Sequence, residues 1–118
     1  IMKHLFFCTV LLCILQACST LSSTTYIDSQ KSFVLGENEH RAYTASVKNV
    51  GDTDIEVVQL NAKGVATSLG ILKNNEKQNY AVVRNATIKF ENKGKEQGVI
   101  KIFARGDTNL SMGYKENE

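Results

Sequence analysis

Residues 86–91 alternate strictly between apolar and polar side chains, and this alternation constrains the fold more than any other feature of the sequence. Ala86, Ile88 and Phe90 are each followed by a polar residue, a threonine, a lysine and a glutamate in turn. Successive side chains point to opposite faces of a strand, whereas a helix repeats every 3.6 residues. The segment therefore predicts a β-strand with one face in a core and the other in solvent.

Similar short segments recur from Lys31 onward, and clusters of glycine, asparagine and charged residues separate them. The segments lie at 33–35, 43–50, 55–60, 65–71, 80–84, 86–91, 99–104 and 110–114. No window after residue 18 keeps an apolar face at helical spacing for three turns. Seven or eight short strands at this spacing are typical of an all-β, small antiparallel β-sandwich, here over residues 31–114. A small closed β-barrel is the alternative fold, and the charged tail 115–118 is expected to fray.

The segment from Leu72 to Val83 resembles the corner before a late strand in fibronectin-type and other immunoglobulin-like domains. That resemblance implies an immunoglobulin-like sandwich. The sequence contains no tryptophan, and the antibody-type core, which needs a buried tryptophan and a cysteine pair, is therefore excluded.

The N-terminal segment has the three-part layout of an export signal. Lys3 and His4 form a basic start, and residues 5–15 form an apolar run of eleven residues. A helix needs about 20 apolar residues to span a bilayer, so this run is too short for a permanent transmembrane helix. It ends at Leu15-Gln16-Ala17-Cys18, where a small residue precedes a cysteine.

These four residues resemble the lipobox of bacterial lipoproteins. The resemblance implies that residues 1–17 are a signal helix cleaved before Cys18, with Leu15, Gln16 and Ala17 read by the processing enzymes. Cys18 would then carry acyl chains such as palmitate and anchor the mature protein to the lipid bilayer of the cell envelope. Ser19 is not the aspartate that retains many such proteins in the inner membrane, so the outer membrane is expected in a Gram-negative host. Residues 18–30, rich in serine and threonine, are predicted to form the lipidated end and a flexible tether.

The charge and cysteine counts of the mature chain exclude several classes of function. Removing residues 1–17 from 118 leaves 101 residues, one domain, with 13 basic and 12 acidic side chains. A net charge of +1 argues against nucleic acid as a partner. Cys8 and Cys13 leave with the signal and Cys18 is lipidated, so no thiol remains for a disulfide or a redox site. We expect no cofactor other than the covalent lipid.

Catalytic and metal chemistry finds little support in the remaining residues. His40 lies in the polar segment 36–41, which predicts a solvated loop histidine and no catalytic triad. Its acidic neighbours do not supply the ligand geometry of a metal site. Asp52 and Asp54 resemble a fragment of a calcium loop without its other ligands, so turn formation explains them better.

Three polar loops are the candidate contact surfaces, because sandwiches place their variable loops at the two ends. They are residues 36–41, 51–54 and 92–98, which carry His40, Asp52, Asp54, Lys93 and Lys95. A second hypothesis pairs the strands on either side of 92–98 as a hairpin. Lys89 and Lys101 would then lie near each other in a basic stripe facing an anionic membrane or polymer.

The sequence thus favours a non-catalytic binding or scaffolding module in the cell envelope, with an envelope protein or a glycan as its partner. Two alternatives stay open. The first is a small hydrolase or carbohydrate-active domain that uses acidic residues, which would need two carboxylates about 5–10 Å apart in a cleft. The second is a structural subunit of an envelope assembly.

Overall fold

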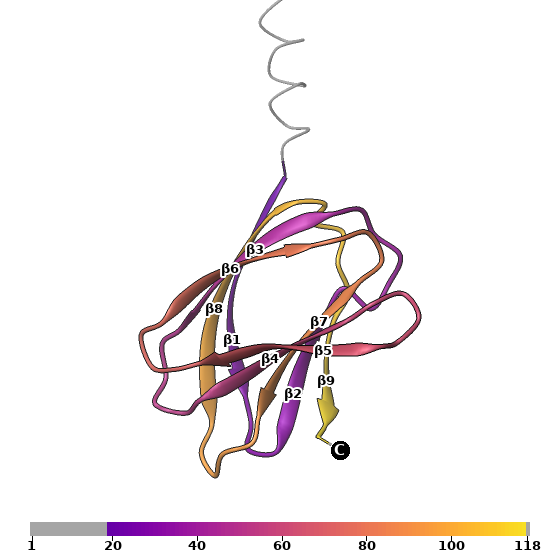
Figure 1. The fold of residues 1–118 in the computed structure, drawn as a ribbon. Helices are drawn as coiled ribbons and strands as arrows, with labels where there is room; N and C mark the ends of the chain where they lie inside the picture. The colour runs from indigo at the N-terminus through magenta and orange to yellow at the C-terminus, as the bar shows by residue number, and fades with distance from the viewer. Residues whose placement is uncertain (1–18, 118) are drawn as a thin grey trace, which may run out of the picture.

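The computed structural model describes residues 19–117, which form two antiparallel β-sheets lying one over the other (Figure 1). The strands are β1 (Thr20–Ile27), β2 (Lys31–Leu35), β3 (Tyr43–Asn49), β4 (Ile55–Leu60), β5 (Ala66–Leu72), β6 (Lys77–Val82), β7 (Thr87–Asn92), β8 (Gly98–Gly106) and β9 (Met112–Glu116). Each segment predicted to be a strand overlaps an observed strand, and the predicted and observed bounds differ by at most a few residues at each end. This described part of the chain contains no helix long and apolar enough to cross a membrane.

The two sheets are open, and their strand orders are β1-β8-β3-β6 and β5-β4-β7-β2-β9. The predicted antiparallel sandwich is confirmed, and the alternative of a closed barrel is wrong. Every connection except β4 to β5 crosses from one sheet to the other. This order is that of a jelly roll with β9 added beside β2. The immunoglobulin-like order is therefore wrong, because there the first two strands are neighbours in one sheet.

The core lies between the sheets and consists of the inward-facing residues of alternating strands. Phe90 and Ile88 on β7 are completely buried, as are Ile100 on β8 and Val47 on β3. The alternation that predicted the 86–91 strand is realised in full, since Thr87, Lys89 and Glu91 face outward. The aromatic contact between Phe33 and Phe90 joins neighbouring strands of the five-stranded sheet, with ring centroids 6.4 Å apart.

The predicted flexible tether is wrong for residues 20–27, which form β1 and pair along their whole length with β8. The inward positions of β1 are Leu21, Ser23, Thr25 and Ile27. Two of these are polar, and their hydroxyls bond to each other at 2.9 Å. Inward and outward residues do alternate along β1. The sequence did not reveal this alternation, because two of the inward residues are small and polar.

The tail also differs from its prediction. Residues 112–116 form β9 beside β2, with Lys31 opposite Glu116. The backbone N–H of Asn117 donates to Gln30, and its side chain donates to the carbonyl of Asn92 at 2.8 Å. Edge pairing and these bonds therefore hold the tail in place as far as residue 117.

Both ends of the sandwich are formed by loops. The chain enters at the end where β1 begins, which we call the entry end, and loop 36–42 lies there. Loops 28–30, 50–54 and 93–97 lie at the opposite, far end (Figure 1). Asn49 and Asn92, the last residues of β3 and β7, are completely buried at the far end.

Candidate functional site: the outer face of the four-stranded sheet

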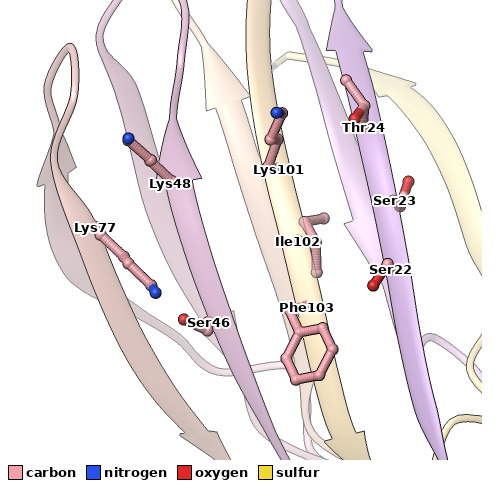
Figure 2. A pocket seen from close by; sticks show the side chains of 9 residues that line it. All are labelled: Ser22, Ser23, Thr24, Ser46, Lys48, Lys77, Lys101, Ile102 and Phe103. Carbon is pink, nitrogen blue, oxygen red and sulfur yellow. The ribbon is translucent and has the colours of Figure 1, made fainter.

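Three lysines stand side by side on the outer face of the four-stranded sheet (Figure 2). Lys48 on β3 is the direct partner of Lys77 on β6 and of Lys101 on β8. We call Lys77, Lys48 and Lys101 the lysine row. Neighbouring strands lie about 4.8 Å apart, so the backbone brings three positive charges close together.

Like charges directly opposite one another destabilise a sheet. The ion pairs among residues 19–117 involve Lys31, Lys89, Lys93 and Lys115, and none includes a member of the lysine row. Lysines on the five-stranded sheet have carboxylate partners, such as Lys89 with Glu91 at 3.3 Å. The two outer faces therefore differ: one is neutralised internally and the other carries uncompensated positive charge.

A hollow of about 490 Å³ lies over this face and contains the lysine row (Figure 2). The hydroxyl-bearing residues that line it are Ser22, Ser23, Thr24 and Ser46. Phe103 on β8 also lines it, and its side chain is 39% exposed. Figure 2 shows the Phe103 ring between Ser46 and Ser22, which are its direct partners on β3 and β1.

Arg105 continues the same face toward the entry end. Its guanidinium carbon lies 5.8 Å from the centre of the Phe103 ring, within the range of a cation–π contact. The outward side chains of β8 thus run lysine, phenylalanine, arginine at positions 101, 103 and 105. Such a surface offers positive charge, hydroxyl groups and an exposed aromatic ring.

The predicted contact residues at the far end are exposed, and one of them is already paired. Lys93 Nζ lies 2.7 Å from Glu56 Oε1, and this hydrogen bond raises the pKa of Lys93. The same bond, with a second from Ser68, lowers the pKa of Glu56. Lys95, Asp52 and Asp54 are exposed in the neighbouring loops. Asp52 and Asp54 do not line the hollow over the lysine row, nor a second hollow at the entry end.

Two buried asparagines hold these far-end loops by the same pattern of bonds. Asn92 Nδ2 donates to the carbonyls of Ile27 and Glu96 at 2.9 and 2.8 Å, and its Oδ1 accepts from Gly94. Asn49 Nδ2 donates to Thr53 and Leu72, both at 2.8 Å, and its Oδ1 accepts from the residue two positions later. The loops that follow the two asparagines are therefore fixed to other strands.

His40 is not a solvated loop residue, since it is 5% exposed and lies at the entry end, away from the other predicted contact residues. Its Nδ1 and Nε2 atoms lie 2.7 Å from the carbonyls of Arg41 and Ala86. Tyr43 packs against it edge-on at 5.2 Å. His40 thus fastens loop 36–42 to the β6–β7 connection.

Tyr43 has the one buried side-chain oxygen among residues 19–117 that lacks a hydrogen-bond partner. Burial raises the pKa of its hydroxyl well above the usual range. The hydroxyl therefore stays protonated at neutral pH.

A second hollow, of about 1000 Å³, lies at the entry end and is lined by Ser19, Arg41, Arg105 and Asp107, among others. Asp107 accepts hydrogen bonds from the backbone N–H groups of Arg41 at 2.7 Å and Asn109 at 2.9 Å. These bonds lower the pKa of its carboxyl. Ser19 follows Cys18 directly in the sequence. Leu15, Gln16, Ala17 and Cys18 themselves lie outside the described residues.

The hypothesis of a hairpin between Lys89 and Lys101 is wrong, because β7 and β8 belong to different sheets. Lys101 joins Lys48 and Lys77 instead, two residues that sequence reasoning did not select. Lys48 lies at a polar position of the predicted segment 43–50, whereas Lys77 lies between two predicted segments. Neither position shows which strands become neighbours.

Similarity to known proteins is found among solved structures. No protein-family model matches the chain, and neither does any curated protein sequence. Among solved structures, the chain is similar to the Yersinia pseudotuberculosis-derived mitogen, with 11% sequence identity and a TM-score of 0.49. That similarity covers 79% of this chain and 94% of the mitogen.

The part of the chain covered by the structure contains no group of three or more His, Cys, Asp or Glu side chains that could hold a metal ion.

Proposed function

We propose that the protein is a lipid-anchored, non-catalytic binding module of the bacterial cell envelope, and that it binds an anionic ligand on the outer face of the four-stranded sheet. The observation that carries the binding site is the lysine row, in which Lys48 faces a lysine on each side without a carboxylate partner. A like-charge row costs folding free energy. An anionic ligand would remove that cost when it binds.

The anchor rests on the lipobox-like residues 15–18, and the position of β1 suggests how an anchored molecule would sit. β1 begins at Thr20, so a single residue separates it from Cys18. Lipidated Cys18 would hold the entry end close to the membrane surface. Thr24 on β1 lies opposite Lys101, four residues beyond Thr20. At about 3.4 Å per residue the lysine row would stand roughly 14 Å further from the membrane than Thr20.

Lipidation can be tested by growing cells that express the chain with an alkyne-labelled fatty acid and analysing the purified protein by mass spectrometry. We expect a mature N-terminus at Cys18 that carries acyl chains, and we expect Cys18→Ala to abolish labelling and membrane retention. A secreted protein with an unmodified thiol would contradict the anchor.

The binding site can be tested with dextran sulfate as an anionic probe and the full chain purified in a non-ionic detergent. Lys48→Thr/Lys101→Thr should weaken binding at least tenfold. The matched control, Lys31→Thr/Lys115→Thr, removes the same charge from the five-stranded sheet. It should bind within about twofold of wild type, because those lysines already pair with Glu116 and Glu37. Equal weakening in both variants would mean that only net charge matters, and would overturn the site.

A further inference from the structure

We infer that the anionic ligand of this face is an acidic polysaccharide, with its carboxylate or sulfate groups over the lysine row and a sugar ring stacked on Phe103. This inference rests on the proposed function and adds the chemical class of the ligand. It depends on Phe103 and on the hydroxyl groups beside it.

The first argument is the order of side chains along β8. Lys101, Phe103 and Arg105 all project from the same face, because side chains alternate along a strand. Residues two apart are separated by about 6.8 Å, so a cation, a ring and a second cation span roughly 14 Å. A linear polymer that carries both acidic groups and apolar ring faces could contact all three at once.

The second argument is the exposure of Phe103. A phenylalanine in the centre of a sheet face is usually covered by its cross-strand neighbours, whose side chains pack against it. Here both neighbours are serines, Ser22 on β1 and Ser46 on β3, and the ring stays 39% exposed. The apolar C–H face of a sugar's pyranose ring could stack on the exposed Phe103 ring.

The third argument is the chemistry of the hollow around Phe103. Ser22, Thr24 and Ser46 each bring a hydroxyl to it, and lysine ammonium groups lie beside them. A hydroxyl can both donate and accept a hydrogen bond, whereas lysine only donates. Sugars present hydroxyls that also do both, so this mixture fits an acidic carbohydrate better than a bare inorganic anion.

Single-stranded nucleic acid also combines negative charge with flat rings, but it fits this face less well. Proteins that bind it offer several aromatic rings on which successive bases stack, along a strongly basic groove. Phe103 is the sole aromatic residue that lines this hollow, and the mature chain carries a formal charge of only +1 by the count above.

The test compares four probes by titration into the full chain in detergent: polygalacturonate, dextran sulfate, polyphosphate and a thymidine oligonucleotide. Wild type should bind the two polysaccharides more tightly than the other two polyanions. Phe103→Leu should weaken polygalacturonate binding about tenfold, as loss of a stacking contact does, and should change polyphosphate binding less than twofold. Phe103→Trp, which keeps a flat ring, should retain the polysaccharide affinity.

Tyr114→Leu is the matched control, since Tyr114 is an exposed aromatic residue on the five-stranded sheet. It should leave all four affinities unchanged. Thermal denaturation of each variant checks that the fold is intact.

Two results would overturn the inference while leaving the proposed function in place. In one, Phe103→Leu binds polygalacturonate as tightly as wild type. In the other, polyphosphate or the oligonucleotide binds at least as well as the polysaccharides, and that binding depends on Lys48. If wild type binds none of the four probes, the inference and the anionic binding site both fail.

Discussion

Lys48 is a residue at which stability and the proposed binding would oppose each other. It faces a lysine on each neighbouring strand, and the pairs of like charge repel. Threonine has a higher preference for strands than lysine and carries no charge. Lys48→Thr should therefore stabilise the fold by about 0.5 kcal/mol while it weakens anion binding.

Urea denaturation at low salt measures this gain in stability, which should shrink as added salt screens the repulsion. Lys31→Thr is the control, because Lys31 pairs with Glu116 and its loss relieves no repulsion. A variant at position 48 that is less stable than wild type would mean that the lysine row is not under electrostatic strain.

His40 illustrates a residue whose environment the sequence could not reveal. The polar segment around it predicted exposure, yet the ring is buried and lies between two carbonyl groups. His40→Ala would leave both carbonyls without a partner, and we expect it to lower the free energy of unfolding by about 2–4 kcal/mol.

The neighbouring exposed residue supplies the comparison for His40. Glu39→Ala should change stability by no more than about 0.5 kcal/mol, as for most surface positions. Chemical denaturation of both variants decides between the two environments, since equal and small effects would mean that His40 is solvated after all.

At the scale of elements, Asn49 and Asn92 connect strand ends to the loops that follow. Asn92→Asp would replace an amide that donates to two carbonyls with a carboxylate that repels them. We expect a loss of about 2–4 kcal/mol in stability at neutral pH, because a buried charge would be left without a partner. Asn79→Asp, at an exposed position of β6, should cost little. Similar midpoints for both variants in thermal melts would contradict the assigned role of Asn92.

The segment after β8 depends on Asp107, and this dependence predicts an effect of pH. Its folded pKa lies below its ordinary value of 3.8. The carboxylate therefore stabilises the fold above pH 3.8, and that contribution is lost as the pH falls through the lower, folded value. Asp107→Asn should melt at a lower temperature than wild type at pH 7.

The difference in melting temperature between wild type and Asp107→Asn should disappear in acid, once the pH has fallen below the folded pKa of Asp107. A difference that is the same at both pH values would show that the charge of Asp107 does not contribute. The protection of the Arg41 and Asn109 amides, corrected for the intrinsic exchange rate at each pH, should fall over the same pH range, because their N–H groups donate to this carboxylate.

Elements with apolar residues on their inward face were predictable, and elements with polar inward residues were not. The alternation in 86–91 is preserved in β7, where Ile88 and Phe90 are buried. β1 was missed because Ser23 and Thr25 face inward and satisfy each other. β9 was misjudged at its end because pairing with β2, and not burial, keeps residues 115 and 116 in place.

For the whole molecule, the sequence indicated a sandwich but not the order of its strands. A period of two specifies which side chains are buried, whereas strand order depends on pairings between distant segments. Lys48, Lys77 and Lys101 come from three such segments and become neighbours only in the order β8-β3-β6. The candidate site is therefore a product of topology, which is why the predicted contact loops did not include it.

In the proposed function, the two ends and the two outer faces of the sandwich would have different roles. The entry end would rest on the membrane through Cys18, and the five-stranded sheet would present a face whose charges are paired. The four-stranded sheet would present its lysines and Phe103 sideways, clear of the lipid surface. A ligand could then be bound without any change in the fold.

Mapping the bound probe residue by residue tests this account most directly. Amide chemical shifts of the isotopically labelled protein in detergent micelles can be followed during titration with dextran sulfate. The account predicts shifts concentrated on β8, β3 and the adjoining part of β1 and β6, centred on Lys48, Lys101 and Phe103. Shifts concentrated on the five-stranded sheet, or spread evenly over both faces, would contradict it.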